Sequence, residues 1–315
     1  MKRLLILLLI QFSLSLSAQQ VENYVIPSEG KIKLAEGIEI DKIPAGYTIW
    51  AGEGDIKGMI VFFHSRRDTV NADDIIIKAL ENDLAIMYVT TDNRLEFLFE
   101  ISRMEELEGY INQACLNYSI PEDRLLYCGM SLAGTRALKI AIHGANDDSF
   151  SISPRAIAVC DAPLDMQRFY VEGKRAAALN YHPAAANEGF WVSSYLESNL
   201  GDPKVNDSLY FEYSPYAYMD IKARHRDALK ATAIRCYTEP DVHWWMQERG
   251  KDYYGMNSTD LAGLINQQIL AGNKEAELIL TEDKGYRDDG SRHPHSWNIV
   301  DEDELVEWFL GMLEE

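Results

Sequence analysis

Three side chain types, spread in order along the chain, could together carry out acyl transfer. Ser131 lies in the first half, Asp241 lies about three quarters of the way along, and His295 lies near the end. A serine hydroxyl is a poor nucleophile until a neutral imidazole takes its proton, and a carboxylate can hold that imidazole in the required tautomer. The chain therefore contains candidates for a nucleophile, an acid and a base.

Ser131 stands at the junction of a predicted buried strand and a predicted helix. The strand is the apolar run 125–128, and the helix follows with helical apolar spacing over 135–142. Gly129 before the serine and Gly134 after it leave room for a sharp turn, which is the pattern of a nucleophile elbow. The N–H of Leu132, at the positive end of the helix, could then bind an oxyanion. The string alone is a weak signal, because short Gly-x-Ser-x-small strings also occur by chance.

The rest of the chain predicts a sheet that could position these residues. Apolar runs and helical patterns alternate, which indicates parallel strands joined by right-handed crossovers. An edge strand or hairpin is expected within 21–40, and further strands at 47–50, 59–64, 84–89, 156–160, 233–237 and 276–280. Helices are expected at 72–80, 101–118, from Ser258 onward, and at 303–313.

One interval between predicted strands is too long to be a loop. About seventy residues separate the strand ending at Cys160 from the strand at Ala233, and they are rich in tyrosine and phenylalanine. We expect residues 164–229 to form a cap inserted above the carboxyl ends of the strands. Residues 19–163 and 230–315 would form the core domain.

With these features in order, the chain resembles the α/β-hydrolase superfamily over most of its expected mature length. In that family, nucleophile, acid and histidine follow one another as Ser131, Asp241 and His295 do here. The resemblance implies an α/β-hydrolase fold with a mostly parallel sheet, helices on both faces and a catalytic triad. Glu239 competes with Asp241 for the role of the acid, because it lies only two residues nearer the strand. His295 is preferred to His293 because the string His-Ser-Trp before a final helix resembles secreted esterases of the family.

The same resemblance implies further site residues. The family commonly has His-Gly-x after the strand that ends at His64, and this chain has serine and Arg66 in the next two positions. The match makes the Arg66 N–H the second oxyanion donor, and the side chains of Arg66 and Arg67 could reach solvent or an anionic group of the substrate. Trp244 and Trp245 follow the acid, where they could border the substrate pocket or pack inside the protein.

The N-terminus predicts export. Lys2 and Arg3 precede an apolar run and a Ser/Leu/Ala stretch ending at Ala18, so residues 1–18 have the pattern of a signal peptide. That apolar run is shorter than a membrane span, and we expect no stable membrane insertion after its removal. We therefore expect a periplasmic or extracellular protein.

Charge and cysteine usage limit the possible partners. The formal net charge of −20 argues against nucleic acid and anionic membranes. The four cysteines lie in predicted buried elements, so we expect them to be free thiols rather than disulfides. We expect no metal or other cofactor, because no Cys/His spacing suggests a metal site.

The sequence therefore predicts an exported serine hydrolase that acts on a small-molecule ester through an acyl-enzyme intermediate. Two alternatives stay open at this point. One is a serine peptidase that cleaves short peptides, since Ser214-Pro215-Tyr216 resembles a string in prolyl-peptidase-like hydrolases. The other is a catalytically silent hydrolase fold that serves as a binding protein.

Overall fold

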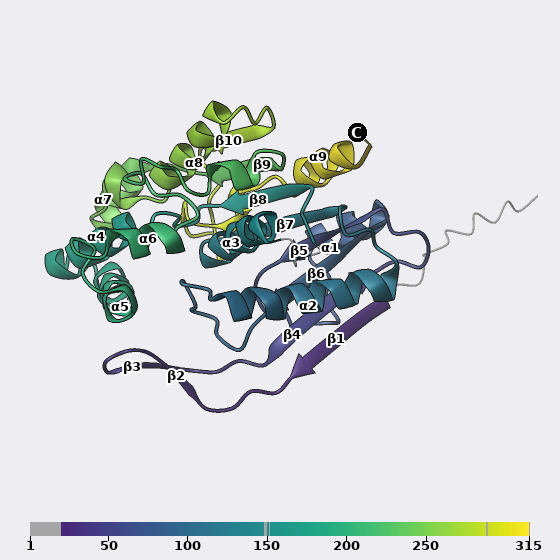
Figure 1. Ribbon diagram of the computed structural model, residues 1–315, viewed down its shortest axis with the longest axis horizontal. Helices are drawn as coiled ribbons and strands as arrows, with labels where there is room; N and C mark the ends of the chain where they lie inside the picture. Colours follow the sequence, from purple (N-terminus) through teal and green to yellow (C-terminus); the bar gives the residue numbers. More distant parts are fainter. Residues whose placement is uncertain (1–19, 148–149, 151, 288, 315) are drawn as a thin grey trace, which may run out of the picture.

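The computed structural model describes residues 20–147, 150, 152–287 and 289–314, which form a doubly covered sheet (Figure 1). The predicted signal peptide, residues 1–18, lies outside the described residues. The main sheet has eight strands in the order β1-β4-β6-β5-β7-β8-β9-β10. They are β1 (Gln20–Ile26), β4 (Ala45–Ala51), β5 (Gly58–Phe62), β6 (Leu84–Thr90), β7 (Leu125–Met130), β8 (Ala156–Cys160), β9 (Ala233–Thr238) and β10 (Ala276–Leu280).

Six of these strands, from β6 to β10 in the sheet order, run parallel, whereas β4 and β1 join the edge antiparallel to their neighbours. A separate hairpin consists of β2 (Lys31–Ala35) and β3 (Ile38–Asp41). The predicted strands are therefore confirmed, including the N-terminal edge strand and hairpin. Because β5, β7, β8 and β9 are central and parallel, their carboxyl ends meet at one edge of the sheet.

Helices cover both faces of the sheet, as the resemblance implied. One face packs against α1 (Asp74–Glu81) and α9 (Glu302–Glu314), and the other packs against α2 (Ile101–Tyr118), α3 (Leu132–Asn146) and α8 (Ser258–Leu270). The strands between the two layers are almost wholly buried, which explains their continuous apolar runs.

The interval between β8 and β9 is helical, and it contains α4 (Met166–Leu179), α5 (Pro183–Leu200), α6 (Asp207–Tyr213) and the short η1 (Arg226–Leu229). In Figure 1, α4, α5 and α6 lie together at one end of the sheet, and the β2–β3 hairpin extends toward α5. Their apolar side chains form a third cluster that includes Met166, Phe169 and Leu196 and also buries Leu34 of the hairpin. The division into core and cap at residues 164 and 229 stays a prediction.

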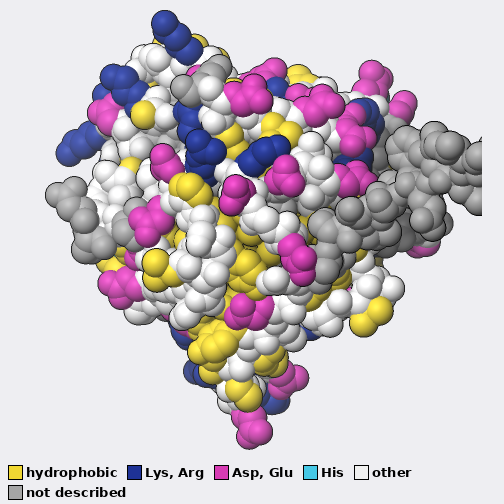
Figure 2. Space-filling view, turned by 90° about the vertical axis from the view of Figure 1, so that its right-hand side faces the viewer, with side chains coloured by type: hydrophobic (Ala, Val, Ile, Leu, Met, Phe, Trp, Pro, Cys, Tyr) yellow, Lys and Arg dark blue, Asp and Glu magenta, His cyan; other side chains and the backbone are white. Residues whose placement is uncertain are grey.

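The expectation of free thiols is confirmed. Cys115, Cys128, Cys160 and Cys236 are all buried and unpaired. Within the described ranges, none of the helices has both the length and the apolar character needed to cross a membrane. Acidic side chains are spread over the face shown in Figure 2, between scattered Lys and Arg side chains.

Candidate active site

Ser131 occupies a sharp turn between β7 and α3, as predicted. Its backbone has φ 54° and ψ −129°, a conformation that costs a non-glycine residue about 1–3 kcal/mol. The turn closes because Gly129 and Gly134 have no side chains. A Cβ on Gly129 would lie 2.3 Å from the carbonyl carbon of Ala133, and one on Gly134 would lie 2.8 Å from the Gly129 oxygen. The structure thus holds a strained serine at the carboxyl end of a central strand.

The turn also orients the first backbone donors of α3. Leu132 is the first residue of this helix, so its N–H is one of the donors that an α-helix leaves without an internal partner. The positive end of the helix dipole lies at the same point. An oxyanion formed on an acyl group attached to Ser131 could be stabilised there.

His295 lies in the loop between β10 and α9, and its ring is bound by a carboxylate. The partner is Asp161, whose Oδ2 lies 2.6 Å from the Nδ1 atom of His295. Asp161 directly follows β8, which neighbours β7 in the sheet. Ser131 reaches the same strand end, because its N–H donates to the carbonyl of Cys160 at 2.8 Å. Serine, aspartate and histidine therefore converge at the carboxyl ends of β7 and β8.

Asp161 is held in place by several hydrogen bonds. It has a left-handed φ of 41°, and its N–H donates to the carbonyl of Tyr237 at 2.9 Å. Its Oδ1 accepts from the hydroxyl of Thr238 at 3.2 Å, and its carbonyl accepts from the side chain amide of Asn257 at 2.9 Å. The Asn257 side chain is in turn bound by Arg168 of α4 at 3.2 Å. These bonds fix the carboxylate that faces His295.

The structure does not bring Asp241 to His295. The chain turns into α7 (Val242–Arg249) directly after it, so its Oδ1 caps that helix by accepting from the Trp244 N–H at 3.0 Å. Its Oδ2 lies 3.0 Å from the guanidinium of Arg292.

Glu239, the competitor, is bound elsewhere too. It accepts from the Thr281 hydroxyl at 2.9 Å and from the Lys284 N–H at 3.0 Å, and it also pairs with Arg292. Both carboxylates therefore support the β9–β10 side of the site. Asp161 was missed, although its position after a buried strand is where α/β folds place functional groups.

The electrostatics of His295 suit a general base. Burial alone would lower its pKa, but the hydrogen bond and the negative charge of Asp161 outweigh that effect, so the pKa of His295 is raised. With Nδ1–H donated to Asp161, the neutral ring leaves Nε2 as an acceptor for a hydroxyl proton. By contrast, burial lowers the pKa of His293 to about 4.

The two predicted arginines are engaged in other contacts. The guanidinium of Arg66 pairs with Asp73 and donates to the Asn71 carbonyl at 2.6 Å. Arg67 donates to Asn23 at 3.1 Å and to the Pro44 carbonyl at 2.8 Å. The structure thus places the side chain of Arg67 against the N-terminal strands rather than against His295. Arg66 itself lies four residues beyond the carboxyl end of β5, the strand that neighbours β7, so its N–H stays a candidate oxyanion donor.

Trp244 and Trp245 lie beside the histidine pair. Their rings meet edge to face at 5.0 Å between centroids, and Trp244 lies at the same distance from the ring of His293. The rings of His293 and His295 are 6.2 Å apart. Neither tryptophan is fully buried, so both can contribute apolar surface next to His293.

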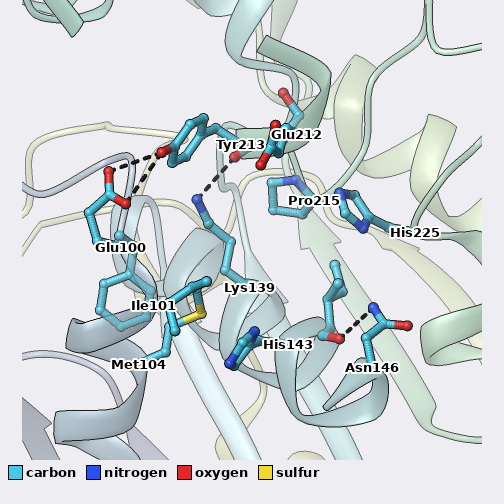
Figure 3. Close-up of a pocket in the computed structure, with 13 residues that line it drawn as sticks. Glu100, Ile101, Met104, Lys139, His143, Asn146, Glu212, Tyr213, Pro215 and His225 are labelled. Atoms are coloured by element: carbon cyan, nitrogen blue, oxygen red, sulfur yellow. Dashed lines mark hydrogen bonds between the residues drawn. The ribbon is translucent and has the colours of Figure 1, made fainter. Parts of the chain in front are cut away.

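A small cavity elsewhere in the molecule lacks the candidate catalytic residues. It has a volume of about 200 Å³ and lies between α2, α3 and the end of α6 (Figure 3). Lys139 points into this region and donates to the carbonyls of Leu98 and Tyr213. Burial lowers the pKa of Lys139 to about 7. Because Ser131 and His295 do not line it, this cavity is separate from the candidate active site.

Solved structures resemble this architecture closely enough to identify it. A puromycin-hydrolysing peptidase of Mycobacterium tuberculosis aligns with 86% of this chain at a TM-score of 0.55 and 16% identity. A fungal esterase of Rhizomucor miehei aligns with 95% at a TM-score of 0.54 and 14% identity. The M. tuberculosis protein MPT51 aligns with 94% at a TM-score of 0.55 and 10% identity. The chain has the α/β-hydrolase fold.

These α/β-hydrolase structures differ in length. The chain spans 38% of the peptidase, but 85% of the esterase and 98% of MPT51. No family model matches the sequence, and no curated protein matches it. At such low identity the comparisons establish the α/β-hydrolase fold, and the chemistry must be argued from the site.

Proposed function

We propose that this chain is an exported serine hydrolase that cleaves carboxylic esters through Ser131, His295 and Asp161. The observation that carries the proposal is the 2.6 Å contact between Asp161 and the Nδ1 atom of His295, at the strand edge where Ser131 occupies a strained elbow. Ser131 and Asp161 are linked to the same strand end, because the Ser131 N–H donates to the carbonyl of Cys160, the residue before Asp161. Export rests on the N-terminal segment alone.

The reaction has two halves. In the first, Nε2 of His295 takes the hydroxyl proton of Ser131 as its Oγ bonds to the acyl carbon, and the carbonyl oxygen becomes an oxyanion near the Leu132 N–H. The oxyanion collapses, the alcohol leaves with the proton from His295, and an acyl-serine remains. In the second, water gives a proton to His295 as it attacks the acyl carbon, the bond between that carbon and Oγ of Ser131 breaks, and His295 returns the proton to Oγ, which releases the acid and restores the serine. Asp161 stabilises the imidazolium in both halves.

The test uses a fluorophosphonate, which labels an activated serine without knowledge of the substrate. The wild-type protein should be labelled stoichiometrically and should hydrolyse p-nitrophenyl acetate. Ser131→Ala should abolish both signals, and His295→Ala should reduce labelling by orders of magnitude, because an unactivated hydroxyl reacts slowly. Ser208→Ala, at an exposed serine of α6, serves as the matched control and should leave both unchanged.

The same experiment separates the alternatives. A folded protein that takes no label and turns over no ester is a silent binding protein, and the proposal fails. Labelling without ester turnover, but with cleavage of short peptides, favours the peptidase. The structure gives Ser214 a structural role, since its hydroxyl accepts from the Met166 N–H at 2.9 Å and donates to the Tyr210 carbonyl at 2.7 Å.

A further inference from the structure

A second, much larger cavity lies between α4, the 202–204 turn, the 216–219 segment and α8. Its volume is about 1120 Å³, which is enough for several sugar rings or a short peptide. Neither Ser131 nor His295 lines it. Its lining includes Arg168, which donates to the side chain of Asn257, and that side chain donates to the carbonyl of Asp161. The cavity therefore adjoins the candidate active site without containing it.

Tyrosine rings line this cavity, and two of them are open to solvent. Tyr218 is 78% exposed and Tyr254 is 61% exposed, whereas Tyr170 and Tyr216 are more buried. The ring of Tyr216 packs closely on Gly263, because a Cβ added to Gly263 would lie 2.3 Å from that ring. Large exposed rings that the core does not use can stack on the apolar face of a ligand.

The charges around the cavity balance. Three acids, Asp165, Asp202 and Asp260, face three bases, Arg168, Lys174 and Lys204. Arg168 and Asp260 form a buried ion pair, and Lys174 also pairs at 3.0 Å with Glu197, which lies outside the lining, so the surroundings of the cavity are close to neutral and slightly acidic. In a chain with a net charge of −20, this balance favours a ligand that carries no net charge.

Polar groups near the rings favour a ligand that carries hydrogen-bonding groups over a purely apolar one. The lining includes the amides of Gln167 and Asn266 and the hydroxyl of Thr259. An acyl chain would remove these groups from water without returning hydrogen bonds, which costs free energy. A sugar ring instead offers an apolar face to a tyrosine and hydroxyls to amides.

We propose that this cavity binds an uncharged oligosaccharide, stacked on Tyr218 and Tyr254. The site is independent of the acyl-transfer chemistry, because its ligand contacts do not include the triad. The inference therefore stands or fails separately from the proposed function.

Binding is tested on the full chain by calorimetry with five uncharged hexasaccharides: those of cellulose, xylan, mannan, amylose and chitin. At least one should bind. Tyr218→Ala and Tyr254→Ala should each weaken that binding about tenfold or more, and Tyr254→Phe should retain it because the stacking ring remains. Tyr253→Ala is the matched control, since Tyr253 is 59% exposed, adjoins Tyr254 in sequence and does not line the cavity. Ser131→Ala should bind as the wild type does.

Two results would overturn the proposal. The first is that none of the five probes binds at millimolar concentration. The second is that a probe binds equally well to the wild type, Tyr218→Ala and Tyr254→Ala, which would place binding elsewhere. Circular dichroism of each variant shows whether a loss of binding reflects unfolding.

Discussion

Replacing Asp161 by Asn should remove most of the proposed esterase activity while leaving the fold intact. Asparagine keeps the size of the side chain and can still accept from Thr238, but its amide would donate to the Nδ1 atom of His295. The ring proton is then forced onto Nε2, which can no longer accept the proton of Ser131. In the best-studied triad this change reduces kcat by about 10⁴-fold, which corresponds to about 5.5 kcal/mol of transition-state stabilisation.

The assay is kcat/KM for p-nitrophenyl acetate, compared with that of Asp241→Asn and Glu239→Gln. Asp241→Asn keeps the helix cap, because an asparagine oxygen can accept from the Trp244 N–H, and it removes only the charge that faces Arg292, so we expect a stability loss below about 1 kcal/mol and an activity change within about tenfold. Should Asp241→Asn or Glu239→Gln abolish turnover while Asp161→Asn retains it, the assignment of the acid from the 2.6 Å contact is refuted.

The pH profile gives a second readout of the same variant. His295 must be neutral to act as a base, so the rate rises with pH through its pKa. Asp161 raises that pKa, so the acid limb of the wild type should lie above the usual value for histidine. In Asp161→Asn the carboxylate is absent, so the effect of burial prevails and lowers the pKa of His295. The residual activity of Asp161→Asn should therefore have its acid limb at lower pH, and an unmoved limb would contradict the reasoning.

Two further predictions concern the framework. Gly134→Ala should destabilise the protein by about 1–3 kcal/mol and distort the elbow, because its Cβ would meet the Gly129 carbonyl at 2.8 Å. Thermal unfolding checks this against Gly109→Ala, an exposed position in α2 with open space, which should stabilise by about 0.5–1 kcal/mol. Asp260→Asn should lower the free energy of unfolding in urea by about 3–5 kcal/mol, because it removes the carboxylate that pairs directly with the buried charge of Arg168. A loss below about 1 kcal/mol would show that water reaches this pair.

The strands and the elbow were predictable because burial on both faces leaves a continuous apolar run in the sequence. The helix 101–118 was predicted with the bounds that the structure shows. The partner of His295 was not predictable in the same way. Asp161 and Asp241 both follow buried strands, so the sequence pattern does not show which of them faces His295. The backbone decides it: Asp161 has a positive φ, and α7 begins directly after Asp241. Local patterns do not encode these angles.

The apolar cluster of α4, α5 and α6 has a consequence for how the chain folds. It buries Leu34 from the N-terminal hairpin together with Leu196 from α5, residues that are far apart in sequence. Contacts of such long separation form slowly, because a large loop must close before any apolar area is buried. The hairpin cannot complete its packing until α5 has formed, so we expect the contact between the hairpin and α5 to form late in folding, after the more local contacts between α4 and α5.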